Sequence, residues 1–274
     1  MTTSSLADLI SRIDDAALIA LPAEYSFVPM DLVRGIIAAQ AKQLHLLCVP
    51  IGGLATDMLI GAGCIATLEA AAVSLGEAGA APRFSEAVVN GDINMLDATC
   101  PAIHSGLQAS EKGVPFMPLG GVIGSDLVEH RKDWQVIDDP LGKGNGRILL
   151  LPAIKPDFAL FHAPLADRDG NVWVGKRREL FTMAHASANA LVTVEHVRNE
   201  CLLDDDLYAA GTIPSMYITE IAKAENGAWP LRLAGSYERD NAAIAVYARA
   251  ARTQTGFDDW MQSHLAARLK CDAE

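Results

Sequence analysis

Two hydrophobic patterns alternate along this chain, unbroken apolar runs and stripes at helical spacing. The run Leu44 to Pro50 has one cysteine among aliphatic residues and is typical of a central parallel strand covered on both faces. Residues 30–40 carry apolar side chains at intervals of three and four, directly after Pro29. Because proline lacks the N–H that a first helical turn leaves unpaired anyway, this segment is expected to be a helix that begins at Pro29.

The same two patterns recur from end to end. They predict helices over residues 5–13, 84–91, 103–112, 180–190, 242–252 and 257–269, and extended segments over 16–21, 114–118, 148–151, 158–162, 172–174 and 191–195. This alternation indicates an α/β fold, an open and mostly parallel sheet flanked by helices, in a single domain over 1–274 with C-terminal helices at about 238–270. The glycine-rich stretch 138–147 is expected to be a mobile loop within it.

Residues 157–175 have the most distinctive amino-acid sequence in the chain. An apolar strand over 158–162 is followed by Asp167, Asp169, Gly170 and Asn171, and then by a second short apolar run. Asp and Asn can bond their own backbone, and Gly can take positive φ, so this polar stretch is a tight turn. The segment is predicted to be strand, turn and strand.

Composition narrows the class of protein. Half of the 274 residues are hydrophobic and a fifth are charged, which is typical of a globular domain with a sizeable core. The formal charge of −12 argues against a nucleic-acid surface, and no apolar run approaches the length of a membrane span. Five scattered cysteines without CxxC spacing, and an N-terminus unlike a signal peptide, favour a reducing cytoplasm.

Ligands on parallel sheets bind outside the carboxyl ends of the strands, so the loops there are the first place to look for a site. Gly52 and Gly53, with Asp57, follow the Leu44–Pro50 strand, and would allow a close backbone approach to an anion. The plainer interpretation is a strand-to-helix turn that needs glycine for its own geometry, and this is favoured for the glycine pair taken alone.

A second glycine-bearing loop leaves the extended segment 114–118. Gly121, Gly124 and Ser125 precede Asp126, and the serine and aspartate are suited to cap a helix whose N-terminus would face a thioester or phosphate. Plain capping explains the same residues equally well. The only tight basic triplet, 176–178, is most simply a solvated charge run.

Several kinds of chemistry are not indicated. The seven histidines lack zinc-helix spacing, and His162, in an apolar strand, is expected to be a hydrogen-bonded core residue; no metal site is predicted. There is no G-x-S-x-G elbow, no GxxxxGK[ST] loop and no Rossmann glycine fingerprint. Glu225 lies in a Glu-Asn-Gly sequence, which without a matching structural context does not indicate a nucleophile.

Four segments together resemble the α subunit of family I coenzyme A transferases. They are Pro29-Met30-x-Leu-Val-Arg34, the stretch from Gly106-Leu-Gln108 to Gly113-Val-Pro-Phe-Met-Pro118, Gly124-Ser125-Asp126, and the turn from Ala166 to Gly175. The resemblance extends from about Ala16 to His264. It implies an open α/β sheet and pairing with a β subunit, in a heterodimer or an α2β2 heterotetramer.

The resemblance also implies a mechanism. In the family a glutamate supplied by the β chain attacks an acyl-CoA, and CoA is carried as a glutamyl thioester to a second carboxylate. The present chain would then hold no catalytic nucleophile and no permanently bound cofactor. Coenzyme A would be its substrate and covalent carrier, and Gly52, Gly53, Asp57, Gly121, Gly124 and Ser125 would line the shared pocket.

One departure from the family is evident. Family α subunits usually carry a glycine-rich loop before the Pro-Met helix, whereas residues 23–28 here contain no glycine. Either the site is remodelled or Glu24 has an accessory role. Two alternatives stay open: an α subunit that hydrolyses thioesters or cleaves ring carbon–carbon bonds, with Asp97 as the nearby acid, and a sugar-phosphate-sensing domain, which the acidic balance disfavours.

Overall fold

The computed structural model describes residues 3–142 and 146–271, with side chains through Leu265. Nine strands form the main sheet, in the order β11-β9-β8-β1-β2-β3-β4, with β10 pairing β8 and β12. These strands are β1 (Leu18–Pro22), β2 (Leu44–Val49), β3 (Ile65–Ala70), β4 (Asn94–Asp97), β8 (Phe158–Asp167), β9 (Val172–Trp173), β10 (Asn189–Arg198), β11 (Thr212–Ile213) and β12 (Glu220–Lys223). Only the pairs that involve β9 are antiparallel. The predicted mostly parallel sheet is confirmed.

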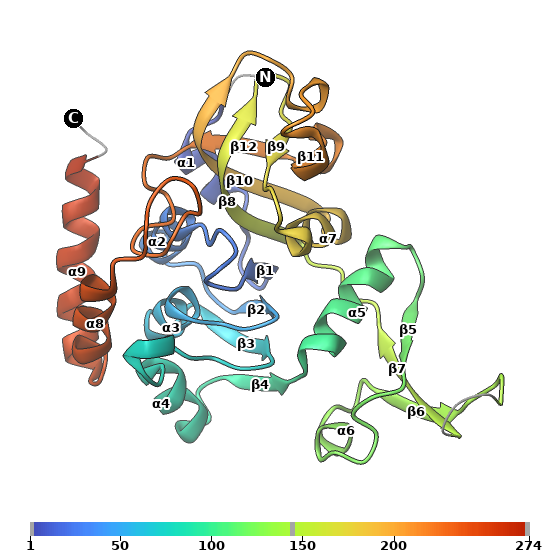
Figure 1. Cartoon of the computed structure of the whole chain (residues 1–274). Coiled ribbons are helices and arrows are strands. Elements are labelled where there is room, and N and C mark those ends of the chain that lie inside the picture. Colours follow the sequence, from blue (N-terminus) through green and yellow to red (C-terminus); the bar gives the residue numbers. More distant parts are fainter. Residues whose placement is uncertain (1–2, 143–145, 272–274) are drawn as a thin grey trace.

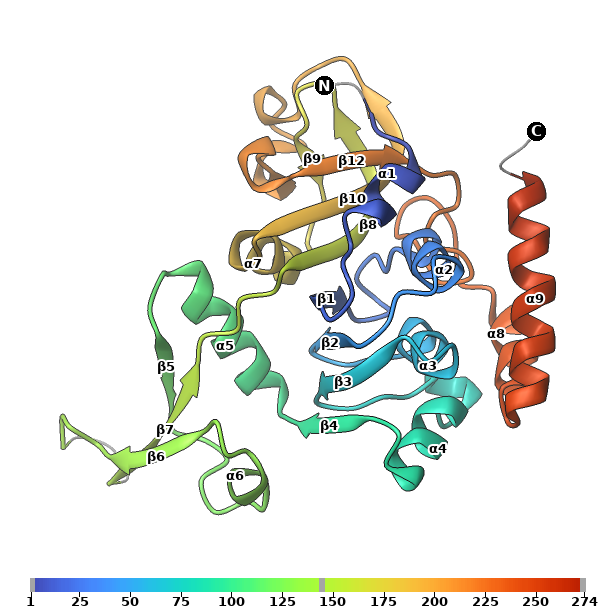
Figure 2. The same ribbon diagram turned by 180° about the vertical axis from the view of Figure 1, so that it is seen from behind.

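Helices cover both faces of this sheet (Figures 1 and 2). On one face lie α1 (Leu6–Ser11), α2 (Met30–Ala38), α3 (Leu54–Gly61), α4 (Pro82–Asn90), α8 (Asn241–Ala250) and α9 (Gln254–Cys271). On the other lie α5 (Cys100–Glu111) and α7 (Arg178–Ala186). A separate hydrophobic core fills each interface, because successive side chains of a strand point to opposite faces: Leu46 lies in the first core and Leu47 in the second.

Local signals in the sequence explain several element ends. Ser5 caps α1 in a capping box with Asp8, and Pro29 precedes α2. Gly113 takes a left-handed φ of 67° just after α5, where a side chain would be strained. The 3₁₀ turns are η1 (Gly76–Ala78), η2 (Leu202–Asp204), η3 (Ala209–Gly211) and η4 (Ser215–Tyr217).

A smaller sheet corrects one expectation. The extended segments 114–118 and 148–151 were predicted as parts of one mostly parallel sheet, but β7 (Arg147–Pro152) pairs antiparallel with β5 (Phe116–Leu119) and β6 (Gln135–Asp138) in a sheet of their own. With α6 (Leu127–His130) these strands form a lobe that projects on the side of α5 (Figure 1). The predicted mobile loop 138–147 connects β6 to β7 and lies partly outside the described residues.

A buried arginine fastens the lobe to the main sheet. Arg131, 4% exposed, pairs with Glu69 of β3 at 2.8 Å and donates to the carbonyl of Asp97 at the end of β4. Its guanidinium also lies 4.5 Å from the ring centroid of Trp134. Burial raises the pKa of Glu69 and Arg131 opposes that rise, so removing the arginine would leave the buried carboxylate with only the more distant His45, at 3.9 Å.

Candidate functional site

The loop that follows β1 lies at the centre of the carboxyl edge of the sheet. Residues 23–28 form it, and the N–H of Ala23 bonds the carbonyl of Val49 at the end of β2. Phe27 takes a left-handed φ of 65°, a conformation that glycine adopts more easily. The N–H of His162 holds the Phe27 carbonyl at 2.8 Å. The loop therefore keeps a tight course without glycine.

Glu24 spans two other elements from this loop. Its Oε1 accepts the N–H of Leu54, in the first turn of α3, at 2.6 Å. Its Oε2 lies 2.6 Å from Nη1 of Arg239, which comes from the loop before α8. Because the positive end of the α3 dipole and the guanidinium both favour an anion, the carboxylate is held in one place and neutralised.

The two predicted glycines enclose this carboxylate. A Cβ on Gly53 would lie 2.1 Å from Oε1 of Glu24, so only glycine permits the present position of that side chain. A Cβ on Gly52 would lie 2.6 Å from Oγ1 of Thr56 and 2.9 Å from Sγ of Cys48. Both positions therefore require glycine for contacts within the chain itself, and binding of a substrate anion by this loop stays a prediction.

A cavity of about 330 Å³ lies beside Glu24, where the loops after β1, β2 and β3 meet. Its walls are apolar for the most part, with charged or polar side chains from a glutamate, a serine and two arginines. The lining residues are Glu24, Tyr25, Ile51, Gly52, Ala72, Ser74, Gly76, Arg232 and Arg239. We refer to it as the carboxyl-edge cavity.

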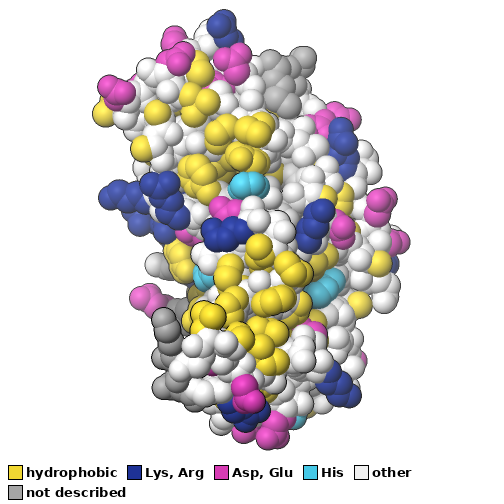
Figure 3. All heavy atoms as spheres, turned by 90° about the vertical axis from the view of Figure 1, so that its right-hand side faces the viewer, with side chains coloured by type: hydrophobic (Ala, Val, Ile, Leu, Met, Phe, Trp, Pro, Cys, Tyr) yellow, Lys and Arg dark blue, Asp and Glu magenta, His cyan; other side chains and the backbone are white. Residues whose placement is uncertain are grey.

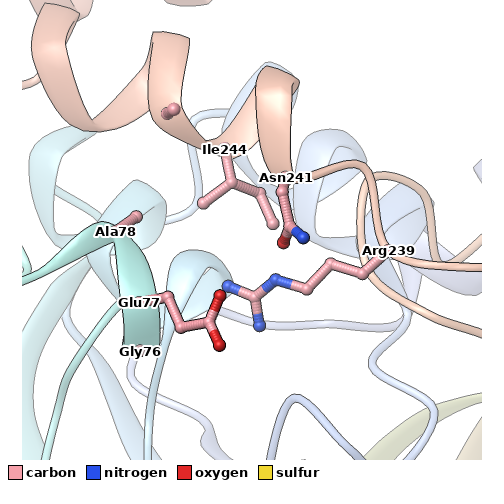
Figure 4. A pocket seen from close by; sticks show the side chains of 7 residues that line it. Gly76, Glu77, Ala78, Arg239, Asn241 and Ile244 are labelled. Atoms are coloured by element: carbon pink, nitrogen blue, oxygen red, sulfur yellow. The ribbon is translucent and has the colours of Figure 1, made fainter.

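Arg239 separates this cavity from a second one of about 500 Å³. Both cavities are lined by Gly76 and Arg239, and the second also by Glu77, Asn241 and Ile244. Figure 4 shows the Arg239 side chain reaching across the second cavity toward Glu77 of η1. A ligand longer than the first cavity would pass along this guanidinium.

Tyr25 links the cavity to the opposite face of the sheet. The guanidinium of Arg177, just before α7, lies 5.5 Å from the Tyr25 ring centroid and 5.8 Å from that of Phe27. The hydroxyl of Ser26 donates to Glu179. The three residues of the basic triplet 176–178 therefore have different surroundings. Arg177 packs on the loop after β1, while Lys176 and Arg178 are exposed.

A buried carboxylate secures the segment that carries the two arginines. Glu195 of β10 accepts the N–H groups of Asn226 and Gly227 at 2.9 and 3.1 Å, and the hydroxyl of Tyr237 at 2.9 Å. Its Oε1 lies 2.9 Å from Nε2 of His162, which is fully buried as predicted. Burial alone would raise the pKa of Glu195, but these hydrogen bonds outweigh it and lower the pKa to about 2. The carboxylate is therefore ionised and anchors the start of segment 225–239.

Asp57 lies behind the glycine loop, away from the carboxyl-edge cavity. It is fully buried; Oδ1 accepts the N–H of Phe84 and Oδ2 the hydroxyl of Tyr247, both at 2.7 Å. Burial raises its pKa to about 6 against the opposing effect of these bonds. Its carboxyl group joins α3 to α4 and α8, and its predicted contact with substrate stays a prediction.

The second predicted loop lies on the lobe. Gly121, Gly124 and Ser125 connect β5 to α6, and none of them lines the carboxyl-edge cavity. The Ser125 hydroxyl donates to the carbonyl of Val122 at 2.8 Å, and α6 is a single turn. The structure therefore gives Ser125 a local turn contact, and binding of substrate by this loop stays a prediction.

Two acidic residues from the sequence lie in ordinary surroundings. Glu225 is exposed in the turn after β12, and Asp97 is exposed at the carboxyl end of β4.

Asp167, Asp169 and Cys201 form a cluster whose potential metal-ligating atoms lie within 4.8 Å of one another. The Asp167 carboxylate, however, accepts four N–H groups, from Asp169, Leu202 and the backbone and side chain of Asn171, as expected of the predicted tight turn.

Sequence reasoning missed the two arginines of the cavity. Arg239 is 215 residues from its partner Glu24, and no spacing rule connects them. Tyr25, Ile51 and Ser74 were missed for a similar reason, because each lies in a loop whose course depends on strands that are distant in sequence.

Among the described residues, no helix is both long and apolar enough to cross a membrane.

The geometry is that of an open α/β protein with a small-molecule cavity at the carboxyl edge of its sheet. The chain belongs to the coenzyme A transferase family, whose family model matches residues 3–224. It is 28% identical to one of the subunits of the 3-oxoadipate CoA-transferase of Pseudomonas knackmussii, over 95% of this chain and 92% of that protein. It is also 28% identical to the cholesterol ring-cleaving hydrolase IpdA subunit of Mycobacterium tuberculosis, over 87% and 84%.

Solved structures confirm the fold. The glutaconate coenzyme A-transferase of Acidaminococcus fermentans superposes with a TM-score of 0.88 at 25% identity, covering 96% of this chain and 88% of that one. The decarboxylase AibA/AibB superposes with a TM-score of 0.82 at 26% identity, covering 97% and 98%. A transferase and a decarboxylase thus share this architecture.

Proposed function

We propose that this chain is the α-type subunit of a heteromeric CoA-transferase that moves CoA between an acyl-CoA and a carboxylate acceptor. The observation that carries the proposal is that the Glu24 carboxylate is already bound within the chain. In the described part of the chain it is the one carboxylate that lines the carboxyl-edge cavity, and it is bound to Arg239 and to the N–H of Leu54. A carboxylate so neutralised is a poor nucleophile, which supports an attacking glutamate supplied by a β-type partner.

The reaction then proceeds through covalent intermediates on the partner. Its glutamate attacks the thioester carbonyl, the CoA thiolate leaves, and an acyl anhydride forms. The thiolate attacks the glutamyl carbonyl, releasing the first acid and leaving a glutamyl-CoA thioester; the acceptor carboxylate reverses these steps. The present chain contributes a cavity with a neutral ion pair in its wall, which admits the acyl part and limits access of water to the anhydride.

The surface that carries α5 and the lobe is the proposed binding face for the partner subunit. Figure 3 shows hydrophobic side chains gathered across the middle of this face. Val114, just after α5, and Phe116, the first residue of β5 in the lobe, are 39% and 45% exposed. Large contiguous apolar surface on a soluble domain marks an interaction site, and two similar proteins are named as subunits. We propose a heterodimer or an α2β2 assembly that acts in the cytoplasm.

The test is reconstitution with a β-type CoA-transferase chain from the same organism. The purified complex and the isolated chain are incubated with acetyl-CoA or succinyl-CoA and a panel of carboxylates, and new acyl-CoA is separated by chromatography. We expect transfer by the complex, none by the isolated chain, and borohydride inactivation of the CoA-loaded partner. Transfer by the isolated chain would overturn the proposal.

One alternative has a specific observation behind it, the similarity to a component of a ring-cleaving hydrolase. In that case the complex would release free CoA, or cleave a ring substrate, with no acceptor acid present. Asp97, exposed at the end of β4, would be the acid of this chain to substitute first. Thiol release measured with and without an acceptor separates the two functions.

A further inference from the structure

The carboxyl-edge cavity has the size of a short acyl chain. Its volume of about 330 Å³ compares with roughly 30 Å³ for one water in the liquid, so it holds about ten non-hydrogen atoms. Tyr25, Ile51 and Ala72 give it apolar walls, suited to methylene groups. Polar recognition must therefore come from the few charged groups of its lining.

One of the two arginines has its charge already matched. Arg239 donates to Glu24 through Nη1 at 2.6 Å and to the carbonyl of Leu75 through Nη2 at 3.1 Å. Glu24 in turn is fixed by the N–H of Leu54. A ligand anion gains little from this pair, because it would have to displace a carboxylate that has two charge-assisted hydrogen bonds.

Arg232 is in a different condition. Its ion-pair partner is Glu238, with Nε to Oε2 at 3.1 Å, and the two side chains are 54% and 80% exposed. An exposed ion pair of this kind contributes at most about 1 kcal/mol, so Glu238 is easily exchanged for another carboxylate. The planar guanidinium of Arg232 is suited to bind that carboxylate with two parallel hydrogen bonds.

We propose that Arg232 determines specificity for substrates with a second, terminal carboxylate, that is, for dicarboxylic acids and their CoA monothioesters. The chain of the acid lies along Tyr25, Ile51 and Ala72, and its distal carboxylate replaces Glu238 on Arg232. Because Glu24 cancels the charge of Arg239, the cavity accepts one additional negative charge and not two. This inference rests on the proposed transfer of CoA to carboxylates.

The test compares two acceptor acids of equal length in the reconstituted complex, adipate and hexanoate, with acetyl-CoA as donor. The wild-type complex should prefer adipate in kcat/KM by at least tenfold. Arg232→Met, which keeps the aliphatic stem, should lower that preference at least tenfold, by raising KM for adipate much more than KM for hexanoate. Arg232→Lys should restore part of it. Arg252→Met, an exposed arginine after α8, is the matched control and should change nothing.

Equal use of the two acids by the wild type, or an unchanged preference in Arg232→Met, would overturn the inference and leave the transferase proposal intact. Absence of transfer to any acid would instead refute the proposed function. Saturation-transfer NMR of adipate and hexanoate on the same complex then decides the inference by itself. Selective adipate signals that disappear in Arg232→Met support it, and equal signals from both acids refute it.

Discussion

Asp57 provides a test of the structure that needs neither partner nor substrate. Its carboxyl is fully buried between α3, α4 and α8, and burial raises its pKa from the ordinary 3.8 to about 6. A group whose pKa is higher in the folded state stabilises the fold most when it is protonated, and that stability is lost as the pH rises from about 4 to about 6. Ionised Asp57 is therefore a destabilising charge at neutral pH.

The size of the effect follows from the shift. One pKa unit corresponds to 1.36 kcal/mol, so a shift from 3.8 to about 6 gives about 3 kcal/mol over the whole window. About 2 kcal/mol of this difference falls between pH 4.5 and pH 7.5, because Asp57 ionises at lower pH in the unfolded chain than in the folded one. Asp57→Asn does not ionise, and its amide can still bond the N–H of Phe84 and the hydroxyl of Tyr247.

We expect the free energy of unfolding of Asp57→Asn, relative to wild type, to rise by about 2 kcal/mol from pH 4.5 to pH 7.5. Urea denaturation followed by tryptophan fluorescence at several pH values measures this difference. The exposed residue Asp14 provides the matched control, because Asp14→Asn should show no such trend. A difference that stays flat across this range would refute the assigned burial and its electrostatic consequence.

Three further outcomes follow from the described contacts. Gly53→Ala should move the flexible end of Glu24 off the N–H of Leu54, so turnover of the reconstituted complex should fall at least tenfold while thermal stability changes little; unchanged turnover would contradict this role. The pKa of Glu195 is lowered from 4.5 to about 2, so the carboxylate contributes about 3 kcal/mol to the free energy of unfolding above pH 4.5, and this contribution is lost as the pH falls toward 2. Glu195→Gln should flatten this acid dependence of stability, measured by circular dichroism. An unaltered profile would count against the hydrogen-bond network around Glu195. Arg131→Met leaves buried Glu69 with only the distant His45, 3.9 Å away, as an ion-pair partner, which costs about 3–5 kcal/mol and should speed amide exchange in the lobe; wild-type exchange rates there would argue against the anchor.

The regular elements with strong local patterns were predictable from sequence. The unbroken apolar run of β2 and the proline before α2 each depend on a few adjacent residues. Strand β3 was missed, since Ile65–Ala70 mixes Thr and Glu among its apolar residues, and the charge of Glu69 is accepted there only because Arg131 arrives from the lobe. Periodicity along one segment carries no information about such a partner.

The candidate site divides in the same way. The glycines at 52 and 53 follow a recognisable strand, so their loop was found at the carboxyl edge. The lobe was not foreseen, because an antiparallel strand such as β7 has the same apolar run as a strand of the main sheet and only its pairing differs. Arg232 and Arg239 depend on the hydrogen bonds of Glu195, which form only after β10 and segment 225–239 are brought together.

The connection between β12 and α8 has a consequence for how proteins of this architecture diversify. It carries both cavity arginines, and it is secured at one point by a buried carboxylate and a tyrosine. Mutations within it can change the charge presented to a substrate while the sheet and its two cores keep their packing. Selection for a new acid can therefore act on a single surface connection, and a graft of that connection should transfer the preference between relatives.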